Sequence, residues 1–95
     1  MDRTATSHDY RHLREFVESR AGAEAYVEPR TNVTEMTVVL VAADGEWTRR
    51  RVAGKDGARE LSHKLGIPVY DVQRTGYPQR MREWSARQKK QQNDG

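Results

Sequence analysis

The sequence predicts an α+β fold in which helices pack a small mixed sheet with a β-hairpin at its centre. Three observations predict it. An amphipathic helical pattern opens the chain, a valine-rich run is joined through Asp44-Gly45 to a second β-prone run, and a proline-led helical pattern closes the chain. With the segments between them, these patterns give the order α-β-β-β-α-β-α.

The first helix is expected over residues 8–21. Arginine, histidine and glutamate occupy one side of this helix, and the apolar residues form a stripe on the other side. The apolar stripe consists of Tyr10, Leu13, Phe16 and Val17. Gly22 can end this helix in a left-handed cap. We expect a short edge strand over 25–28, because the run is β-prone and Pro29 ends it.

The strongest local signal is the stretch MTVVLVAADGEWTRRRVA. The pair Asp44-Gly45 favours a two-residue type I′ turn and hence a β-hairpin. Such a turn would place Trp47 opposite Ala42, on the same face of the sheet as Leu40. The apolar first strand should then be central, and the arginine-rich second strand should lie near an edge, where charges discourage further pairing.

A second amphipathic helix is expected in DGARELSHKLG, residues 56–66, with Asp56 as its N-cap and Gly66 at its end. A short strand over 69–72 follows. A right-handed crossover should set that strand parallel to the second hairpin strand. Pro78 suits the first position of a final helix, because its φ is already helical and its missing N–H is not needed there.

The 95 residues are expected to form a single domain. We assign residues 1–7 to a flexible N-terminus, residues 8–90 to one α+β domain, and residues 91–95 to a frayed tail. A domain of this size buries only about two thirds of its unfolded surface. A partner, or self-association into a homo-oligomer, would therefore add stability.

The composition excludes several functional classes. The chain has no cysteine, which rules out disulfides, thiolate nucleophiles and thiolate metal sites. It also lacks a phosphate loop and a dinucleotide fingerprint. Its longest apolar run, residues 38–43, is far shorter than the ~20 residues that a membrane span needs, and no export signal opens the chain. We expect a cytoplasmic protein with no cofactor, no metal and no membrane contact.

Two weaker patterns each have a functional and a structural interpretation. His8 and His12 lie four residues apart, with Glu15 nearby, which is a metal-ligand spacing, but two surface histidines are favoured. Asp71 follows a strand, where sites in α/β folds gather. A turn-capping role, through backbone N–H groups or a pair with Arg74, is favoured for it.

The element order is also similar to the core of restriction-endonuclease-like nucleases. Their metal site needs an acidic residue two positions before a lysine on one strand, so that carboxylates hold Mg²⁺ and the lysine helps to activate water. Here Glu46 is followed two positions later by Thr48. A degenerate nuclease-like domain is therefore a remote alternative, and we predict a protein that is not an enzyme.

Charge is the most informative feature. Residues 49–90 hold twelve lysines and arginines against four acidic residues. Arginine binds phosphate through a planar fork, and an aromatic ring can stack on an unpaired base. This asymmetry predicts an anion-binding surface, most readily for nucleic acid or another polyanion. The candidate residues are Arg49, Arg51, Arg74, Tyr77, Arg80, Arg82, Arg87, Lys89 and Lys90.

Two alternatives accompany this prediction. The charges of the last helix also fit an ordinary solvated face, with Met81 and Trp84 packed inward and Arg80, Arg82 and Arg87 outward. The small core and the surplus of amphipathic surface fit an accessory subunit that docks on a larger bacterial protein assembly, through the sheet edge or the last helix.

The stretches LVAADGEWTRRRV and GIPVYDVQRTGYPQRMREW resemble a family of small uncharacterised actinobacterial proteins. The resemblance covers residues 33–87, well over half of the chain. Members of that family are sometimes labelled oxidoreductase. The resemblance implies a bacterial cytosolic protein and no established mechanism.

Overall fold

The structure, a computed structural model, describes residues 7–52 and 54–94, with side chains described for 9–52 and 54–91. It confirms the α+β fold and the expected order of elements, with one added short helix, α3. The elements in chain order are α1 (Ser7–Ser19), β1 (Glu24–Glu28), β2 (Thr37–Val41), β3 (Trp47–Arg51), α2 (Gly54–Leu65), β4 (Val69–Asp71), α3 (Val72–Thr75) and α4 (Gln79–Asp94).

The four strands form one mixed sheet in the order β3-β2-β1-β4. β2 is antiparallel to both β1 and β3, whereas β4 is parallel to β1. The apolar strand β2 is therefore internal and the arginine-rich β3 is an edge, as expected. Two expectations are corrected. β1 is internal because β4 pairs with it, and β4 runs in the same direction as β3 but at the opposite edge.

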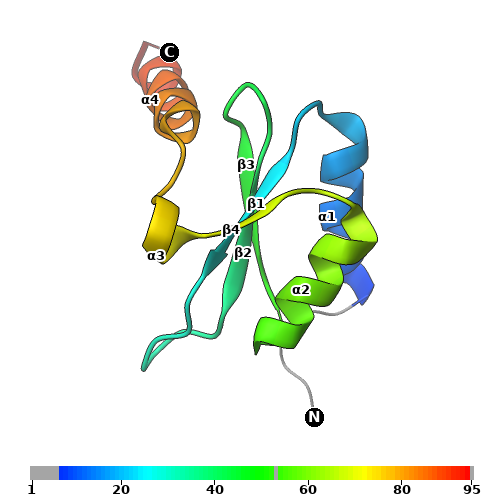
Figure 1. Cartoon of the computed structure of the whole chain (residues 1–95). Helices are drawn as coiled ribbons and strands as arrows, with labels where there is room; N and C mark the ends of the chain where they lie inside the picture. The colour runs from blue at the N-terminus through cyan, green and yellow to red at the C-terminus, as the bar shows by residue number, and fades with distance from the viewer. Residues whose placement is uncertain (1–6, 53, 95) are drawn as a thin grey trace.

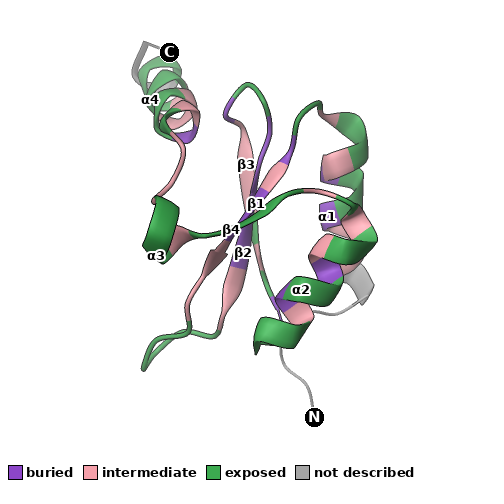
Figure 2. Ribbon diagram, in the orientation of Figure 1, coloured by how far each residue is buried: buried purple, intermediate pink, exposed green. Residues whose placement is uncertain are grey.

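Helices cover both faces of the sheet (Figure 1), α1 and α2 on one side and α3 and α4 on the other. The α1/α2 face holds the larger core, in which Leu13 of α1 and Leu40 of β2 are fully buried. Ala58 and Leu61 of α2 are also buried in this core. Figure 2 shows that buried positions concentrate along β2 and on the inner faces of the helices.

The α4 face has a smaller core. Val39 and Val41 of β2 are completely buried there, together with Tyr26 of β1 and Met81 of α4. Trp47 packs against them from the edge strand. Both faces of β2 are thus covered, which explains its continuous run of apolar residues.

Helix bounds differ from expectation at several ends. α1 ends at Ser19, and α2 begins at Gly54, so that Asp56 lies in its first turn and is not its cap. α4 continues to Asp94, four residues beyond the expected end of the domain. The predicted flexible N-terminus falls almost wholly outside the described residues. None of the helices described is long and apolar enough to span a membrane.

The β2–β3 loop has three residues, not two. The Ala42 N–H donates to the Glu46 carbonyl at 2.8 Å, and the Gly45 N–H donates back to the Ala42 carbonyl at 2.9 Å. Gly45 has a φ of +98°, but Asp44 does not have a positive φ, as a type I′ turn would require. This pattern is the three-residue hairpin loop in which a glycine forms a bulge.

The longer loop shifts the hairpin register by one residue. Trp47 pairs with Val41 and not with Ala42, and Arg49 pairs with Val39. Because side chains alternate along a strand, a shift of one residue moves all of them to the opposite face. Trp47, Arg49 and Arg51 therefore lie on the α4 face of the sheet, and the expected placement of Trp47 beside Leu40 is wrong.

Gly45 is also the point at which the hairpin meets α4. A Cβ atom on this buried residue would lie 2.0 Å from the Arg80 carbonyl oxygen and 2.9 Å from Trp84 Cβ. Only a residue without a side chain allows the loop backbone to approach the helix backbone this closely. The loop and the start of α4 are thus fitted to each other.

Gly45→Ala should destabilise the fold far more than Gly66→Ala does. Both glycines have positive φ, +98° and +65°, but a Cβ at Gly66 would meet nothing within 4 Å. The control should therefore cost only the conformational strain, about 1–2 kcal/mol. Gly45→Ala adds the displacement of α4, for a total of about 3 kcal/mol or more. Urea unfolding measures both variants, and equal losses would show that the loop does not pack on α4.

Candidate functional site

Glu28 of β1 binds residues from three separate segments. Arg49 donates to both carboxylate oxygens, at 2.7 and 2.9 Å, and the Thr37 hydroxyl donates at 2.6 Å. The Tyr77 hydroxyl donates to the same carboxylate. These four hydrogen bonds fill the acceptor positions of a carboxylate. Burial raises the pKa of Glu28, but the hydrogen bonds outweigh it and leave the pKa below its ordinary value.

Glu24, at the other end of the same strand, ties α4 to the sheet. Arg80 donates to Glu24 at 2.6 Å and also to the Ala42 carbonyl at 2.9 Å. The hydroxyls of Tyr26 and Tyr70 donate to Glu24 at 3.2 Å each, and their rings stack with centroids 5.3 Å apart. The hydrogen bond from Arg80 is the main reason that the pKa of Glu24 lies below its ordinary value, against the effect of burial.

Three of the predicted anion-binding residues therefore bind other residues of the protein. The expected outward orientation of Arg80 is wrong, because its guanidinium lies between Glu24 and the β2 backbone. Tyr77 is half-buried and its hydroxyl is bound to Glu28. Arg49 is held by the same carboxylate, with its guanidinium 5.2 Å from the centre of the Trp47 ring.

The other six predicted residues are exposed, and the structure gives none of them an ion pair within the described chain. They are Arg51, Arg74, Arg82, Arg87, Lys89 and Lys90. Arg82 donates to Gln79 Oε1 at 3.1 Å, and Arg87 donates to the Asp44 carbonyl at 3.1 Å. These are neutral acceptors, so the positive charges of both side chains remain uncompensated.

Four of these six residues lie on α4, whose two sides differ. The inner side packs on the sheet through Met81, which is 8% exposed, and half-buried Trp84. Ser85 accepts a hydrogen bond from Trp47 Nε1 at 2.9 Å. On the outer side, Arg82, Lys89 and Lys90 share one stripe, because their spacing of seven and eight residues returns to the same helical face. Figure 2 shows this outer side as exposed.

Arg51 and Arg74 do not join that stripe. Arg51 ends β3 at the opposite end of the strand from the loop that meets α4. Arg74 lies in the short helix α3, before the turn that leads into α4. The structure therefore reduces the predicted basic surface to the outer side of α4, with Arg74 and Arg51 as separate exposed charges.

A polar seam joins α1 to the edge strand β3. Arg20 binds the Glu46 carboxylate at 2.7 and 2.9 Å, and His12 Nε2 lies 2.8 Å from the Thr48 hydroxyl. Asp9 pairs with Arg50 one step further along β3, at 3.5 Å. The three positions alternate along the chain, so they share one face. The seam therefore lies on the α1/α2 face of the sheet, opposite Trp47, Arg49 and Arg51.

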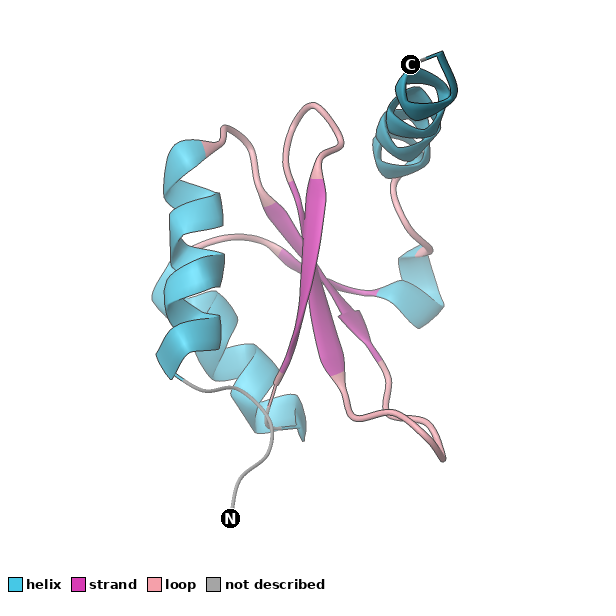
Figure 3. Cartoon of the chain, turned by 180° about the vertical axis from the view of Figure 1, so that it is seen from behind, coloured by secondary structure: helices cyan, strands magenta, loops and turns pink. Residues whose placement is uncertain are grey.

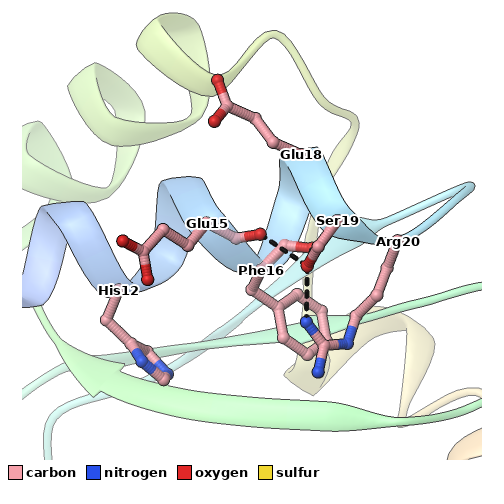
Figure 4. A pocket seen from close by; sticks show the side chains of 6 residues that line it. All are labelled: His12, Glu15, Phe16, Glu18, Ser19 and Arg20. Carbon is pink, nitrogen blue, oxygen red and sulfur yellow. Dashed lines mark hydrogen bonds between the residues drawn. The ribbon is translucent and has the colours of Figure 1, made fainter.

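The seam borders a groove of about 490 Å³ along α1, lined by His12, Glu15, Phe16, Glu18, Ser19 and Arg20. Figure 4 shows the Arg20 guanidinium over the Phe16 ring, with a distance to the ring centre of 4.3 Å. The described residues contain no group of three side chains able to hold a metal ion. The His8 side chain lies outside the described residues.

Asp71 has the structural role that was favoured. Its side chain accepts a hydrogen bond from the Gln73 N–H at 2.8 Å and caps α3. Glu46, the carboxylate considered for a nuclease-like site, is bound by Arg20.

Sequence reasoning missed the roles of Glu24 and Glu28. The alternation in Glu24-Ala25-Tyr26-Val27-Glu28 was the signal that could have found them. In a strand, this alternation places both carboxylates and the tyrosine on one face. Two carboxylates on a largely buried face require cationic partners, and the nearby arginines are the available ones.

No protein-family model, curated protein or solved structure matches this chain. The resemblance to an actinobacterial family therefore stays a prediction.

Replacing Glu28 should weaken the fold in a pH-dependent way. Glu24 and Glu28 have lowered pKa values in the folded state. They therefore stabilise the fold above about pH 4.3, the unfolded value for glutamate, and this stabilisation is lost as the pH falls through the folded values. Glu28→Gln should cost about 1–3 kcal/mol at pH 7 and make the acid limb of the stability curve shallower.

Chemical unfolding at a series of pH values measures that curve. Glu35→Gln is the matched control, because Glu35 is exposed and has no hydrogen bond or ion pair within the described residues. A Glu28→Gln curve parallel to that of the wild type would contradict the assigned role of Glu28.

Proposed function

We propose that this protein is a non-enzymatic cytoplasmic module that binds a polyanion, nucleic acid in particular, through the outer side of α4. One observation carries the proposal. Four cationic side chains lie within residues 82–90, all exposed and none in an ion pair with a described carboxylate. Glu83 is the single acidic residue of that stretch, so the stretch has a net charge of about +3.

Elsewhere in the molecule, many cationic side chains are paired with carboxylates. Within the part of the chain that the structure describes, six ion pairs join arginine or lysine to a carboxylate: Arg14–Glu18, Arg20–Glu46, Arg49–Glu28, Arg50–Asp9, Lys64–Glu60 and Arg80–Glu24. None of them involves a residue of α4 beyond Arg80. Exposed pairs contribute little to stability, but they reduce the local positive potential. The exposed cations of α4 have no such partner among the described residues, so the positive potential around them is not reduced in this way.

Clustered like charges on a helix repel one another by a few tenths of a kcal/mol per pair. Phosphate groups relieve this repulsion, and each neutralised phosphate releases condensed counterions, which drives binding. Arginine adds directional bidentate hydrogen bonds. Binding of this kind uses the backbone of the nucleic acid and needs no catalytic group.

A second candidate function is docking on a partner protein through the β4 edge. Val69 and Tyr70 of this strand are 39% and 37% exposed, which is high for large apolar residues. They border a groove of about 500 Å³ between β4 and α2. Docking there would not require the cations of α4, so variants of α4 separate the two functions.

Charge removal on α4 tests the proposal. The triple variant Arg82→Gln, Lys89→Gln, Lys90→Gln should bind labelled nucleic acid at least about tenfold more weakly at low salt, a loss of about 1.4 kcal/mol. The slope of log K against log salt should fall by about 1 for each phosphate contact removed. Fluorescence anisotropy over a salt series measures both quantities.

The matched control is Arg30→Gln, Lys55→Gln, Arg59→Gln. It changes the net charge equally, and all three residues are exposed outside α4. An equal loss in both variants would reduce the effect to net charge alone. Binding by the α4 variant at wild-type strength would overturn the proposed function.

A further inference from the structure

We infer that the polyanion is a B-form DNA duplex and that the last turns of α4 enter its major groove. This inference rests on the proposed function and adds the class of nucleic acid and the mode of contact.

The end of α4 beyond Gln88 makes no hydrogen bond or ion pair with the body among the described residues. The last hydrogen bond described between this helix and the rest of the chain is that from Arg87 to the Asp44 carbonyl, and Gln88 is half-buried. Residues 89–94 continue the helix, and at 1.5 Å per residue they span about 9 Å. Figures 1 and 3 show α4 at one corner of the molecule, with its C-terminal end pointing away from the sheet.

A free helix end can be surrounded by a partner, which a helix packed along its whole length cannot. The major groove of B-DNA is about 12 Å wide and about 8.5 Å deep, and it admits one α-helix. The free end of α4 fits these dimensions. The body would then remain outside the groove, with Arg82 near the phosphates at its edge.

The residues near this end of the helix suit a nucleic-acid partner. Residues 86–91 read ARQKKQ and contain no carboxylate and no aromatic residue, and Asp94 is the single acidic residue after them. Arg87, Lys89 and Lys90 donate to phosphate oxygens and to guanine, while the amides of Gln88 and Gln91 can both donate and accept. Lysine and arginine near the C-terminus also interact favourably with the helix dipole, so the cations do not weaken the helix that presents them.

Single-stranded nucleic acid is the less suitable partner. Its binding relies on aromatic rings on which bases stack, and α4 has no aromatic residue after Trp84. Trp84 is half-buried beside Gly45, and the Tyr77 hydroxyl is held by Glu28. The aromatic residues near the basic surface therefore pack or form hydrogen bonds within the fold and are not presented to a base.

Double-stranded RNA is also disfavoured. The major groove of an A-form helix is deep and too narrow for side chains to read. A free helix end gains no groove contacts there and touches only outer phosphates. The structure thus predicts a preference for DNA over RNA duplexes of the same sequence.

Anisotropy with three labelled probes of about 20 base pairs or nucleotides, two helical turns of duplex, tests this inference. The probes are a DNA duplex, an RNA duplex and a DNA single strand of matched sequence. The DNA duplex should bind at least tenfold more tightly than the other two. Dimethyl sulfate should also show protection of guanine N7, which lies in the major groove.

A matched pair of variants locates the contact. Gln91→Glu places a negative charge on the end of α4, whereas Asn32→Asp places the same charge in the loop between β1 and β2, and both residues are exposed. Gln91→Glu should weaken DNA binding at least fivefold and remove the N7 protection, while Asn32→Asp should change neither. An unchanged helix content by circular dichroism shows that both variants fold.

The outcomes separate the two proposals. Equal affinity for the three probes, or DNA binding without N7 protection, or binding insensitive to Gln91→Glu, overturns the inference and leaves the polyanion function intact. Binding to none of the probes overturns both.

Discussion

The close approach of the β2–β3 loop to α4 is the constraint on which the rest of the α4 face depends. The loop backbone at Gly45 touches the carbonyl of Arg80 with no room for a Cβ atom. That contact holds the Arg80 side chain against Glu24 and the Ala42 carbonyl. It also orients the helix, so that Met81 faces the sheet and Arg82, Lys89 and Lys90 face away. A backbone contact thus decides which cations are structural and which are exposed.

The arginines divide into two groups because of the two carboxylates on β1. Glu24 and Glu28 lie on a face that α4 and the segment before it largely cover, so each requires donors to offset the loss of water. Arg80 and Arg49 are the cations that reach them. Both were predicted to bind an external anion. Their hydrogen bonds to Glu24 and Glu28 instead join α4 and β3 to the centre of the sheet.

The sequence predicts the order of elements, the central position of β2 and the edge position of β3, because each follows from a local pattern of apolar residues. It does not predict the hairpin register. The pair Asp44-Gly45 is compatible with a two-residue turn and with a three-residue loop. The three-residue loop is the one that contacts α4, and α4 lies far along the chain. That single difference moves Trp47 and Arg49 to the other face. The pairing of β4 with β1 is likewise a tertiary choice, since strand direction alone allows either edge.

The candidate surface could be predicted only where it depends on local sequence patterns. Exposure of Arg82, Lys89 and Lys90 follows from helical spacing once Met81 is placed inward. The loss of Arg80, Tyr77 and Arg49 from that surface depends on carboxylates about 20 to 55 residues away in the chain. What remains on α4 for an external partner is two arginines and two lysines, of which Arg87, Lys89 and Lys90 lie toward the end of the helix, where no described carboxylate pairs with them. Side chains left unpaired in this way retain their full charge for phosphate, and this is the physical reason that the end of α4, and not the basic strand β3, is the better candidate for contact with DNA.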